Sequence, residues 1–132
     1  MDKIKLTFSD KFEGEFTSPT GTVAIGSKPG AMKPYHLLFG ALGSCFYATF
    51  LSIVEKKKLT FSGAEITIDG EKREEVPTTL KRVSIAVVIY DPSDEAQFLR
   101  SVELGAKYCS IHETVSQVAK IDFNVRFEYT NK

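Results

Sequence analysis

Two cysteines and two histidines are the side chains of this sequence best suited to nucleophilic, redox or metal chemistry: Cys45, Cys109, His36 and His112. A cysteine thiolate is a nucleophile, and it can be oxidised to a sulfenic acid and then to a disulfide. The two cysteines lie too far apart in the sequence to form a local CxxC pair. They are therefore either inert core residues or a redox pair, and their spacing does not say whether they meet.

Cys109 comes directly before the residues SIHE, in which Ser110 and Glu113 fit a helix capping box. The box predicts a short helix over residues 111–119, with Cys109 one position before the N-cap. Backbone N–H groups and the dipole at such a helix start favour a thiolate, and His112 adds to this effect if it is protonated. An ordinary residue at a loop–helix junction is the alternative.

Cys45 lies in the middle of the uncharged stretch PYHLLFGALGSCFYATFLSIV, residues 34–54. The stretch is long enough to cross about 30 Å of hydrocarbon. Its small and polar residues nevertheless lower its hydrophobicity below that of a typical membrane span. We expect a protein-covered helix over residues 34–57, and within it an inert core cysteine is the alternative to a reactive one.

The helix expected over residues 34–57 carries two ridges at four-residue spacing. The ridge of large apolar residues consists of Leu38, Leu42, Phe46, Phe50 and Val54, and the ridge of small residues consists of Gly40, Ser44, Ala48 and Ser52. Small side chains let another backbone approach closely. A helix that is apolar on most sides must be covered by protein on each of them, which indicates a dimer.

Other kinds of site find little support in the sequence. The two cysteines and two histidines form a nominal zinc-ligand set, but their spacing resembles no zinc finger or knuckle, so we expect no metal. The sequence contains no GxGxxG, P-loop or GxSxG motif, so we expect no cofactor. The acidic residues Glu71, Glu74 and Glu75 stand among basic ones and predict a solvated turn.

Composition limits the class of protein and its partners. Seventeen Lys and Arg side chains balance seventeen Asp and Glu side chains, which argues against binding to nucleic acid or to an anionic membrane. The first residues, MDKIKLTFSD, alternate charged and apolar side chains and do not read as a signal peptide. We therefore expect one cytoplasmic domain over residues 1–132.

Periodicity predicts the remaining elements. Period-two alternation predicts a hairpin over residues 4–18, a third strand over 22–25, two long strands over 61–68 and 80–90, and a last strand over 121–129. Apolar residues at helical spacing predict a helix that is capped by Ser93 and ends near Ala106. This order indicates an α+β fold with antiparallel sheet.

The order of these motifs resembles that of the OsmC/Ohr family of thiol peroxidases. The resemblance rests on a proline that opens an apolar helix ending in Ser-Cys (PYHLLFGALGSC), on two long strands, and on a second cysteine that opens another helix (KYCSIHETVS). It covers nearly the whole chain, and the segments EKREEVP and KYCS resemble the YhfA-like branch. It implies a single OsmC-like domain over residues 1–132, in an intertwined homodimer whose antiparallel sheets wrap around long central helices.

The resemblance also implies an antioxidant activity. Cys45 corresponds to the peroxidatic cysteine, which attacks an organic hydroperoxide and becomes a sulfenic acid. Cys109 corresponds to the resolving cysteine, which forms a disulfide with it. A dithiol reductant, of the lipoyl type in this family, then restores both thiols. The alternative function is that of a dimeric small-molecule-binding or redox-sensing protein that keeps the fold without peroxidase turnover.

The sequence departs from the family pattern near the start of the long helix. The best-characterised Ohr-type members carry a glutamate ten residues before the first cysteine, where this chain has Tyr35 beside His36. They also carry an N-terminal arginine, which favours the thiolate and orients the peroxide, whereas no arginine here precedes Arg73. Tyr35 and His36 are the candidate substrate-binding substitutes, and the loop lysines Lys28 and Lys33 are alternatives. Ten residues of helix rise about 15 Å, so Tyr35 or His36 reaches a Cys45 only from the other subunit.

Overall fold

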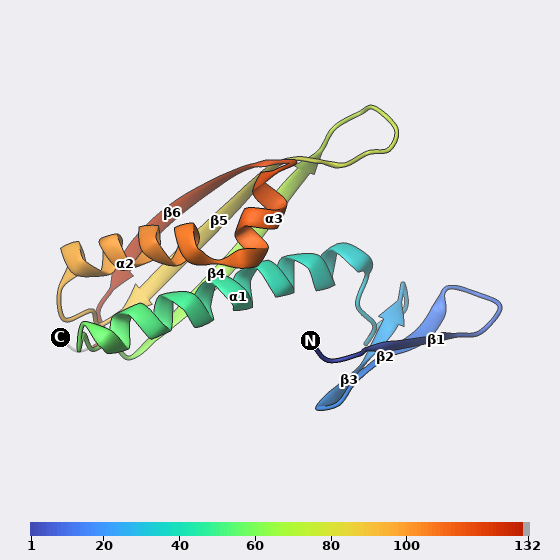
Figure 1. The fold of residues 1–132 in the computed structure, drawn as a ribbon, viewed down its shortest axis with the longest axis horizontal. Helices are drawn as coiled ribbons and strands as arrows, with labels where there is room; N and C mark the ends of the chain where they lie inside the picture. The colour runs from blue at the N-terminus through green and yellow to red at the C-terminus, as the bar shows by residue number, and fades with distance from the viewer. Residues whose placement is uncertain (131–132) are drawn as a thin grey trace. The chain divides into compact units, whose positions relative to one another are not determined.

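The computed structural model describes residues 1–130, and the chain forms two compact units, Met1–Gly40 and Ala41–Lys132. The elements in chain order are β1 (Lys5–Phe8), β2 (Glu13–Ser18), β3 (Gly21–Gly26), α1 (Pro34–Lys56), β4 (Gly63–Lys72), β5 (Leu80–Tyr90), α2 (Glu95–Tyr108), α3 (Ser110–Ser116) and β6 (Lys120–Glu128) (Figure 1). The predicted α+β class and the predicted element order are confirmed. The expectation of one domain over residues 1–132 stays a prediction.

The first unit contains a three-stranded antiparallel sheet in the order β1-β2-β3. Leu6 pairs with Phe16, and Phe16 pairs with Val23, so these side chains share one face. That face, which we call the N-terminal apolar face, carries Leu6, Phe8, Phe16, Val23 and Ile25. Leu6, Phe8 and Val23 keep 48%, 46% and 38% of their surface exposed. Most of this apolar face is therefore not covered within the chain.

The second unit contains a three-stranded sheet in the order β4-β5-β6. The pair β4–β5 is antiparallel, as predicted, but the pair β5–β6 is parallel. The antiparallel prediction was therefore wrong for this one pair. The helices α2 and α3 lie between β5 and β6 in the chain, and a crossover through helices is what a parallel pair requires. Strand periodicity carries no information about strand direction.

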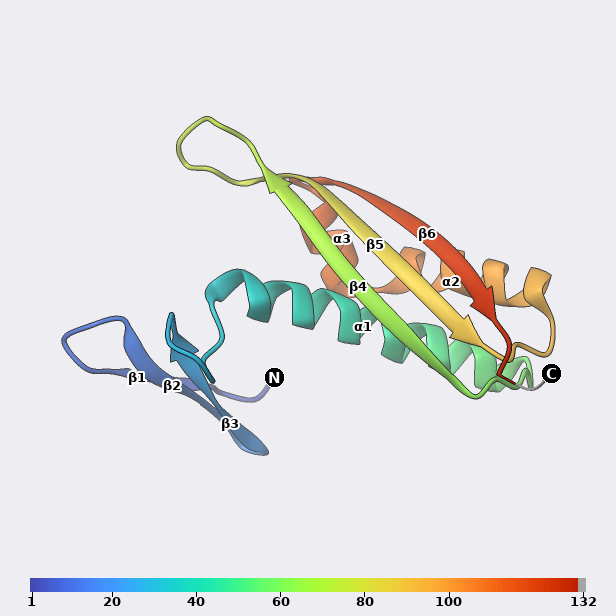
Figure 2. The ribbon, with the colours of Figure 1, turned by 180° about the vertical axis from the view of Figure 1, so that it is seen from behind.

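The helices α1 and α2 cover one face of the β4-β5-β6 sheet and leave the other face open (Figures 1 and 2). The large apolar ridge of α1 packs on this sheet, and Leu42, Phe46, Phe50 and Val54 are buried as predicted. Gly43 brings α1 close to β4, since a Cβ at this position would lie 3.0 Å from Cδ1 of Ile68. By contrast, Ser44, Ala48 and Ser52 of the small-residue ridge are exposed.

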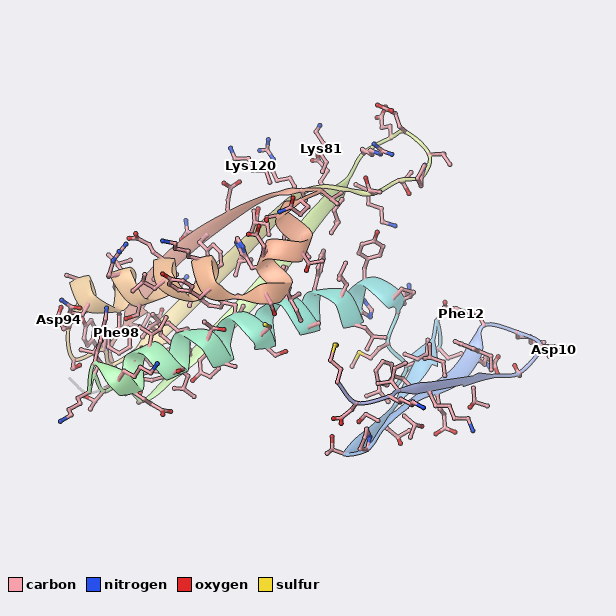
Figure 3. All side chains as sticks on the ribbon, in the orientation of Figure 1. Asp10, Phe12, Lys81, Asp94, Phe98 and Lys120 are labelled. Carbon is pink, nitrogen blue, oxygen red and sulfur yellow. The ribbon has the colours of Figure 1, made fainter. Side chains whose placement is uncertain are left out.

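Phenylalanine rings join the helices to each other and to the sheet. The Phe46 ring lies 4.9 Å from the Phe123 ring on β6. The Phe98 ring of α2 lies 6.1 Å from Phe50 and 5.5 Å from Phe61, and Phe98 is fully buried. Figure 3 shows Phe98 on the side of α2 that faces α1. This cluster fixes α2 over α1 and so determines where the segment after α2 begins.

The start of α2 differs by one residue from the prediction. Its N-cap is Asp94, whose Oδ1 accepts a hydrogen bond from the backbone N of Gln97 at 3.1 Å. Ser93 is not the cap, because its hydroxyl oxygen accepts a hydrogen bond from the backbone N of Thr60 at 3.0 Å. Both residue types cap helices well. A contact with Thr60, which is distant in the sequence, decides which of the two residues caps the helix. The sequence around the cap carries no information about that contact.

The loop between β4 and β5 extends beyond the helices (Figure 1). Residues 71–78 are exposed, Glu71 forms an ion pair with Lys81 at 3.5 Å, and Nε of Arg73 donates to the carbonyl oxygen of Pro77. The prediction of a solvated turn in this acidic segment is confirmed.

Within the described residues, α1 is the one helix that is long and apolar enough to cross a membrane, by length and composition alone. The core helix of a soluble protein passes the same test, and one face of α1 is buried against the sheet. The evidence that α1 spans a membrane is therefore weak.

Candidate active site

The fold brings Cys45 and Cys109 together. Cys45 lies in the middle of α1 and is half-buried, whereas Cys109 lies between α2 and α3 and is fully buried. Both are free thiols, and the Cys109 side chain lies near enough to Cys45 to lower the pKa of the Cys45 thiol. The packing of α2 on α1 brings the two cysteines together. Neither their spacing in the sequence nor the motifs around them could therefore reveal that they are neighbours.

Cys109 is the N-cap of α3. Its Sγ accepts a hydrogen bond from the backbone N of His112 at 3.3 Å, and its carbonyl oxygen accepts one from the backbone N of Glu113 at 3.0 Å. The prediction that Ser110 is the cap was therefore wrong, and Ser110 is the first residue of the helix. The Cys109 sulfur takes the place of the oxygen that a capping side chain usually offers. The helix ends at Ser116, three residues earlier than predicted.

The surroundings of Cys45 favour its thiolate. The backbone N–H of Ile111 makes the largest contribution to lowering the pKa of the Cys45 thiol, and burial acts against it. The side chain of Cys109 and both the hydroxyl and the backbone N–H of Ser110 lower this pKa further. Hydrogen bonds donated to a charged sulfur stabilise it relative to the neutral thiol. The donors all come from Cys109 and the first turn of α3.

The surroundings of Cys109 have the opposite effect. Burial is the main cause that raises the pKa of the Cys109 thiol, and the adjacent Cys45 raises it further. The sequence favoured a thiolate at Cys109, and this prediction was wrong. The backbone N–H groups of His112 and Ile111 lower the pKa of Cys109, but they do not outweigh burial, whereas those of Ile111 and Ser110 lower the pKa of Cys45. The pair thus consists of a thiol with a lowered pKa and a neighbouring thiol with a raised pKa.

His112 contributes no positive charge to this pair at neutral pH. Its ring stacks on Phe123 with the ring centres 5.7 Å apart. Burial lowers the pKa of His112, and the nearby Glu113 raises it by less. The imidazole is therefore neutral at pH 7. His112 was expected to support a thiolate at Cys109 only if it is protonated, and it is not protonated at this pH.

The candidate binding residues Tyr35 and His36 belong to the first unit. Nδ1 of His36 accepts a hydrogen bond from the backbone N of Lys33 at 3.0 Å, and the Tyr35 ring packs edge-on against Phe39. Nζ of Lys28 forms an ion pair with Glu13 at 2.8 Å. These contacts anchor the start of α1 and the preceding loop. The binding role of Tyr35 and His36 stays a prediction.

Residues 1–130 contain no group of three or more His, Cys, Asp and Glu side chains placed to hold a metal ion. The chemistry that the arrangement supports is that of a thiolate and a neighbouring thiol.

Alkylation should distinguish the two cysteines. At pH 7 we expect iodoacetamide to modify Cys45 at least about tenfold faster than Cys109, because the Cys45 pKa is lowered and Cys109 is buried and holds its proton. The rate at Cys45 should rise with pH and level off above its lowered pKa. Mass spectrometry of the tryptic peptides measures both rates. Equal rates in the native protein, matching those in urea, would contradict the assignment.

The chain is similar to proteins of one family over most of its length. The family model described as "OsmC-like protein" matches residues 26–124, which include both cysteines. The protein YhfA of Escherichia coli is 28% identical over 112 residues, which cover 83% of this chain and 84% of YhfA. The crystal structure of an OsmC-like protein from Mycoplasma pneumoniae matches with a TM-score of 0.85 and 18% identity over 96% of each chain. An organic hydroperoxide resistance protein, OsmC, from Legionella pneumophila matches with a TM-score of 0.75 and 13% identity, again over 96% of each chain.

Proposed function

The chain belongs to the OsmC-like protein family, and from this premise we propose that it is a cysteine-based peroxidase that reduces organic hydroperoxides. Cys45 is the nucleophile and Cys109 is the resolving cysteine. The observation that carries the proposal is the contact between two thiols of opposite character, one with a lowered and one with a raised pKa. The similarity in fold to a protein described as an organic hydroperoxide resistance protein supports the choice of substrate.

The chemistry follows from these two thiols. The Cys45 thiolate attacks the terminal oxygen of the hydroperoxide, the O–O bond breaks, and the alkoxide leaves as an alcohol after taking a proton. Cys45 becomes a sulfenic acid. The Cys109 thiol then attacks the Cys45 sulfur, water leaves, and a disulfide forms. A dithiol reductant, of the lipoyl type in our proposal, supplies two electrons and returns both cysteines to thiols.

We further propose that the protein is a cytoplasmic homodimer. Two surfaces of the chain support this, each within its own unit: the exposed N-terminal apolar face, and the exposed ridge of Ser44, Ala48 and Ser52 on α1. Exposed apolar patches mark interaction sites, and small side chains let another helix approach closely. In the dimer, Tyr35 and His36 of the partner subunit serve as the substrate-binding residues.

The dimer can be tested by its mass in solution. We expect the wild-type chain to show twice the monomer mass in light scattering at micromolar concentration. Ala48→Arg should shift it toward the monomer, because the long charged side chain blocks close approach of a second helix. Ala86→Arg, on the open face of the β4-β5-β6 sheet where Ala86 is also exposed, is the matched control. A monomeric wild type would contradict the proposal.

The activity can be tested by hydroperoxide consumption. Reduced protein with cumene hydroperoxide and dihydrolipoamide should consume peroxide catalytically, and faster than it consumes hydrogen peroxide at equal concentration. Consumption no faster than that by the reductant alone would overturn the peroxidase proposal.

A binding or redox-sensing function is the second candidate, and one observation favours it. No arginine precedes Arg73, so the described N-terminal unit offers no guanidinium to orient a peroxide. A sensor would form the Cys45–Cys109 disulfide once, in a stoichiometric reaction, and would show no sustained turnover with a dithiol reductant. The same assay therefore separates the two candidates.

A further inference from the structure

Gly105 lies inside α2, one helical turn before Cys109. Glycine is the poorest helix former apart from proline, so the helix itself gives no reason for a glycine at this position. Gly105 is buried, and the space that a side chain would take is already filled. A Cβ at this position would lie 3.1 Å from Cε1 of Phe46, 3.1 Å from Cβ of Phe50 and 3.2 Å from Cα of Phe50. The missing side chain therefore lets α2 pack directly against the backbone of α1.

This close contact lies beside both cysteines. On α1, Phe46 directly follows Cys45. On α2, Cys109 is the C-cap, and its backbone N donates to the carbonyl oxygen of Ala106 at 3.4 Å. Cys109 is thus tied to the last turn of α2, which is the turn that contains Gly105. Because Gly105 sets the distance between the two helices, it also sets the position of Cys109 relative to Cys45.

Phe123 of β6 shows independently that the surroundings of the two cysteines meet. Its ring lies 4.9 Å from the Phe46 ring and 5.7 Å from the His112 ring. Phe46 is the chain neighbour of Cys45, and the backbone N of His112 donates to Sγ of Cys109 at 3.3 Å. The segments that follow the two cysteines therefore pack on the same ring.

The separation of the helices matters because a disulfide tolerates little variation in distance. The Cα atoms of bridged cysteines lie about 4.4–6.8 Å apart, and a bridge across more than about 7 Å needs backbone movement. A side chain at residue 105 would meet Cα and Cβ of Phe50, which no rotation of the ring can move. The helices α1 and α2 would therefore have to separate by a few tenths of an ångström to admit even a methyl group.

We propose that Gly105 is a positioning residue that holds Cys109 within bonding reach of Cys45 by letting α2 touch α1. This inference rests on the proposed function, in which Cys109 resolves the sulfenic acid of Cys45. A larger side chain at residue 105 disfavours the disulfide, although both cysteines are still present. If Gly105 served only the helix, alanine would stabilise α2 and leave the disulfide unaffected, because alanine is the better helix former.

Three variants test the role of Gly105. Gly105→Ala and Gly105→Val add side chains of increasing size at the contact. Gly63→Ala is the control, since a Cβ there would meet no atom of the described residues within 4 Å beyond its chain neighbours. The readout is the equilibrium constant for disulfide formation with glutathione, measured by acid quenching and mass spectrometry without peroxide. In this reaction the two thiols give up two electrons and two protons, which convert one oxidised glutathione into two reduced molecules.

We expect the constant to fall by about fivefold in Gly105→Ala and by up to about 100-fold in Gly105→Val, which is the range expected for overpacking. Gly63→Ala should keep the wild-type constant. The constant compares two folded states, so a loss of stability that both states share does not change it. Circular dichroism checks that each variant is folded.

An unchanged constant in folded Gly105→Val would overturn the inference, and so would an equal fall in Gly63→Ala. If Gly105→Val does not fold, Gly105→Ala decides: a constant equal to or above that of the wild type refutes the positioning role. The glutathione assay needs no hydroperoxide, so it separates this inference from the proposed function. A protein without peroxidase turnover whose constant still falls in Gly105→Ala would refute the function and uphold the role of Gly105.

Discussion

Replacing Cys45 with serine is expected to lower hydroperoxide turnover by more than about 100-fold, to the level of the reductant alone. The hydroxyl of serine is far less acidic than a thiol, so the hydrogen-bond donors around residue 45 cannot produce an anion at neutral pH. Cys45 is half-buried in α1, and serine is close in volume to cysteine. We therefore expect the fold to be retained, which circular dichroism checks.

Cys109→Ser is the matched variant, and its expected phenotype is different. Cys45 should still react once with hydroperoxide, but its sulfenic acid should accumulate and be trapped by dimedone, because no adjacent thiol condenses with it. Serine is a good N-cap, so α3 should keep its first turn. Wild-type turnover in Cys45→Ser would refute the assignment of the nucleophile, and full turnover without a trapped sulfenic acid in Cys109→Ser would refute that of the resolver.

Phe98→Ala is expected to lower the free energy of unfolding by about 4 kcal/mol. The Phe98 ring is fully buried against Phe50 and Phe61, and its removal leaves a cavity between α2 and α1. Leu99→Ala, at the neighbouring position of α2 where the residue is 43% exposed, should lower the free energy of unfolding by less than about 1 kcal/mol. Urea titration at one fixed protein concentration measures both, since association would otherwise shift the midpoints.

Similar losses in the two variants would contradict the packing described for α2. Because this packing also brings Cys109 to Cys45, Phe98→Ala variants that remain folded should alkylate Cys109 faster than the wild type does. Leu99→Ala should leave the alkylation rate of Cys109 unchanged.

The elements of this fold follow from the periodicity of the sequence, but the direction of one strand pair does not. The ridge of Leu42, Phe46, Phe50 and Val54 is buried as its four-residue spacing predicts, and the alternating strands form where they are expected. The parallel pairing of β5 with β6 was missed. Alternation reports which side chains share a face, whereas direction depends on the path of the α2–α3 crossover.

The helix caps show a second limit of local sequence. Asp94 and Ser93 are equally plausible N-caps, and a contact of Ser93 with Thr60 decides between them. Cys109 takes the role that the S-x-x-E pattern gives to Ser110. Capping preferences describe which residue types suit a position on average, and tertiary contacts select among them.

The candidate site was predicted in part. A resemblance to a known family paired Cys45 with Cys109, and the structure brings the two side chains into contact. Local reasoning placed the thiolate at Cys109, because that residue adjoins a helix start. The N–H groups of Ser110 and Ile111 also act on a sulfur on another helix, burial dominates at Cys109, and no pattern along the chain encodes either effect.

The most direct test of the Cys45–Cys109 assignment is the state of the two cysteines after one equivalent of cumene hydroperoxide. Reduced protein is treated, remaining thiols are blocked with iodoacetamide, and the peptides are separated without reductant and identified by mass spectrometry. We predict a cross-linked peptide pair that contains Cys45 and Cys109, formed with consumption of the peroxide and absent from Cys45→Ser. Both cysteines recovered as alkylated thiols, with the peroxide intact, would contradict it.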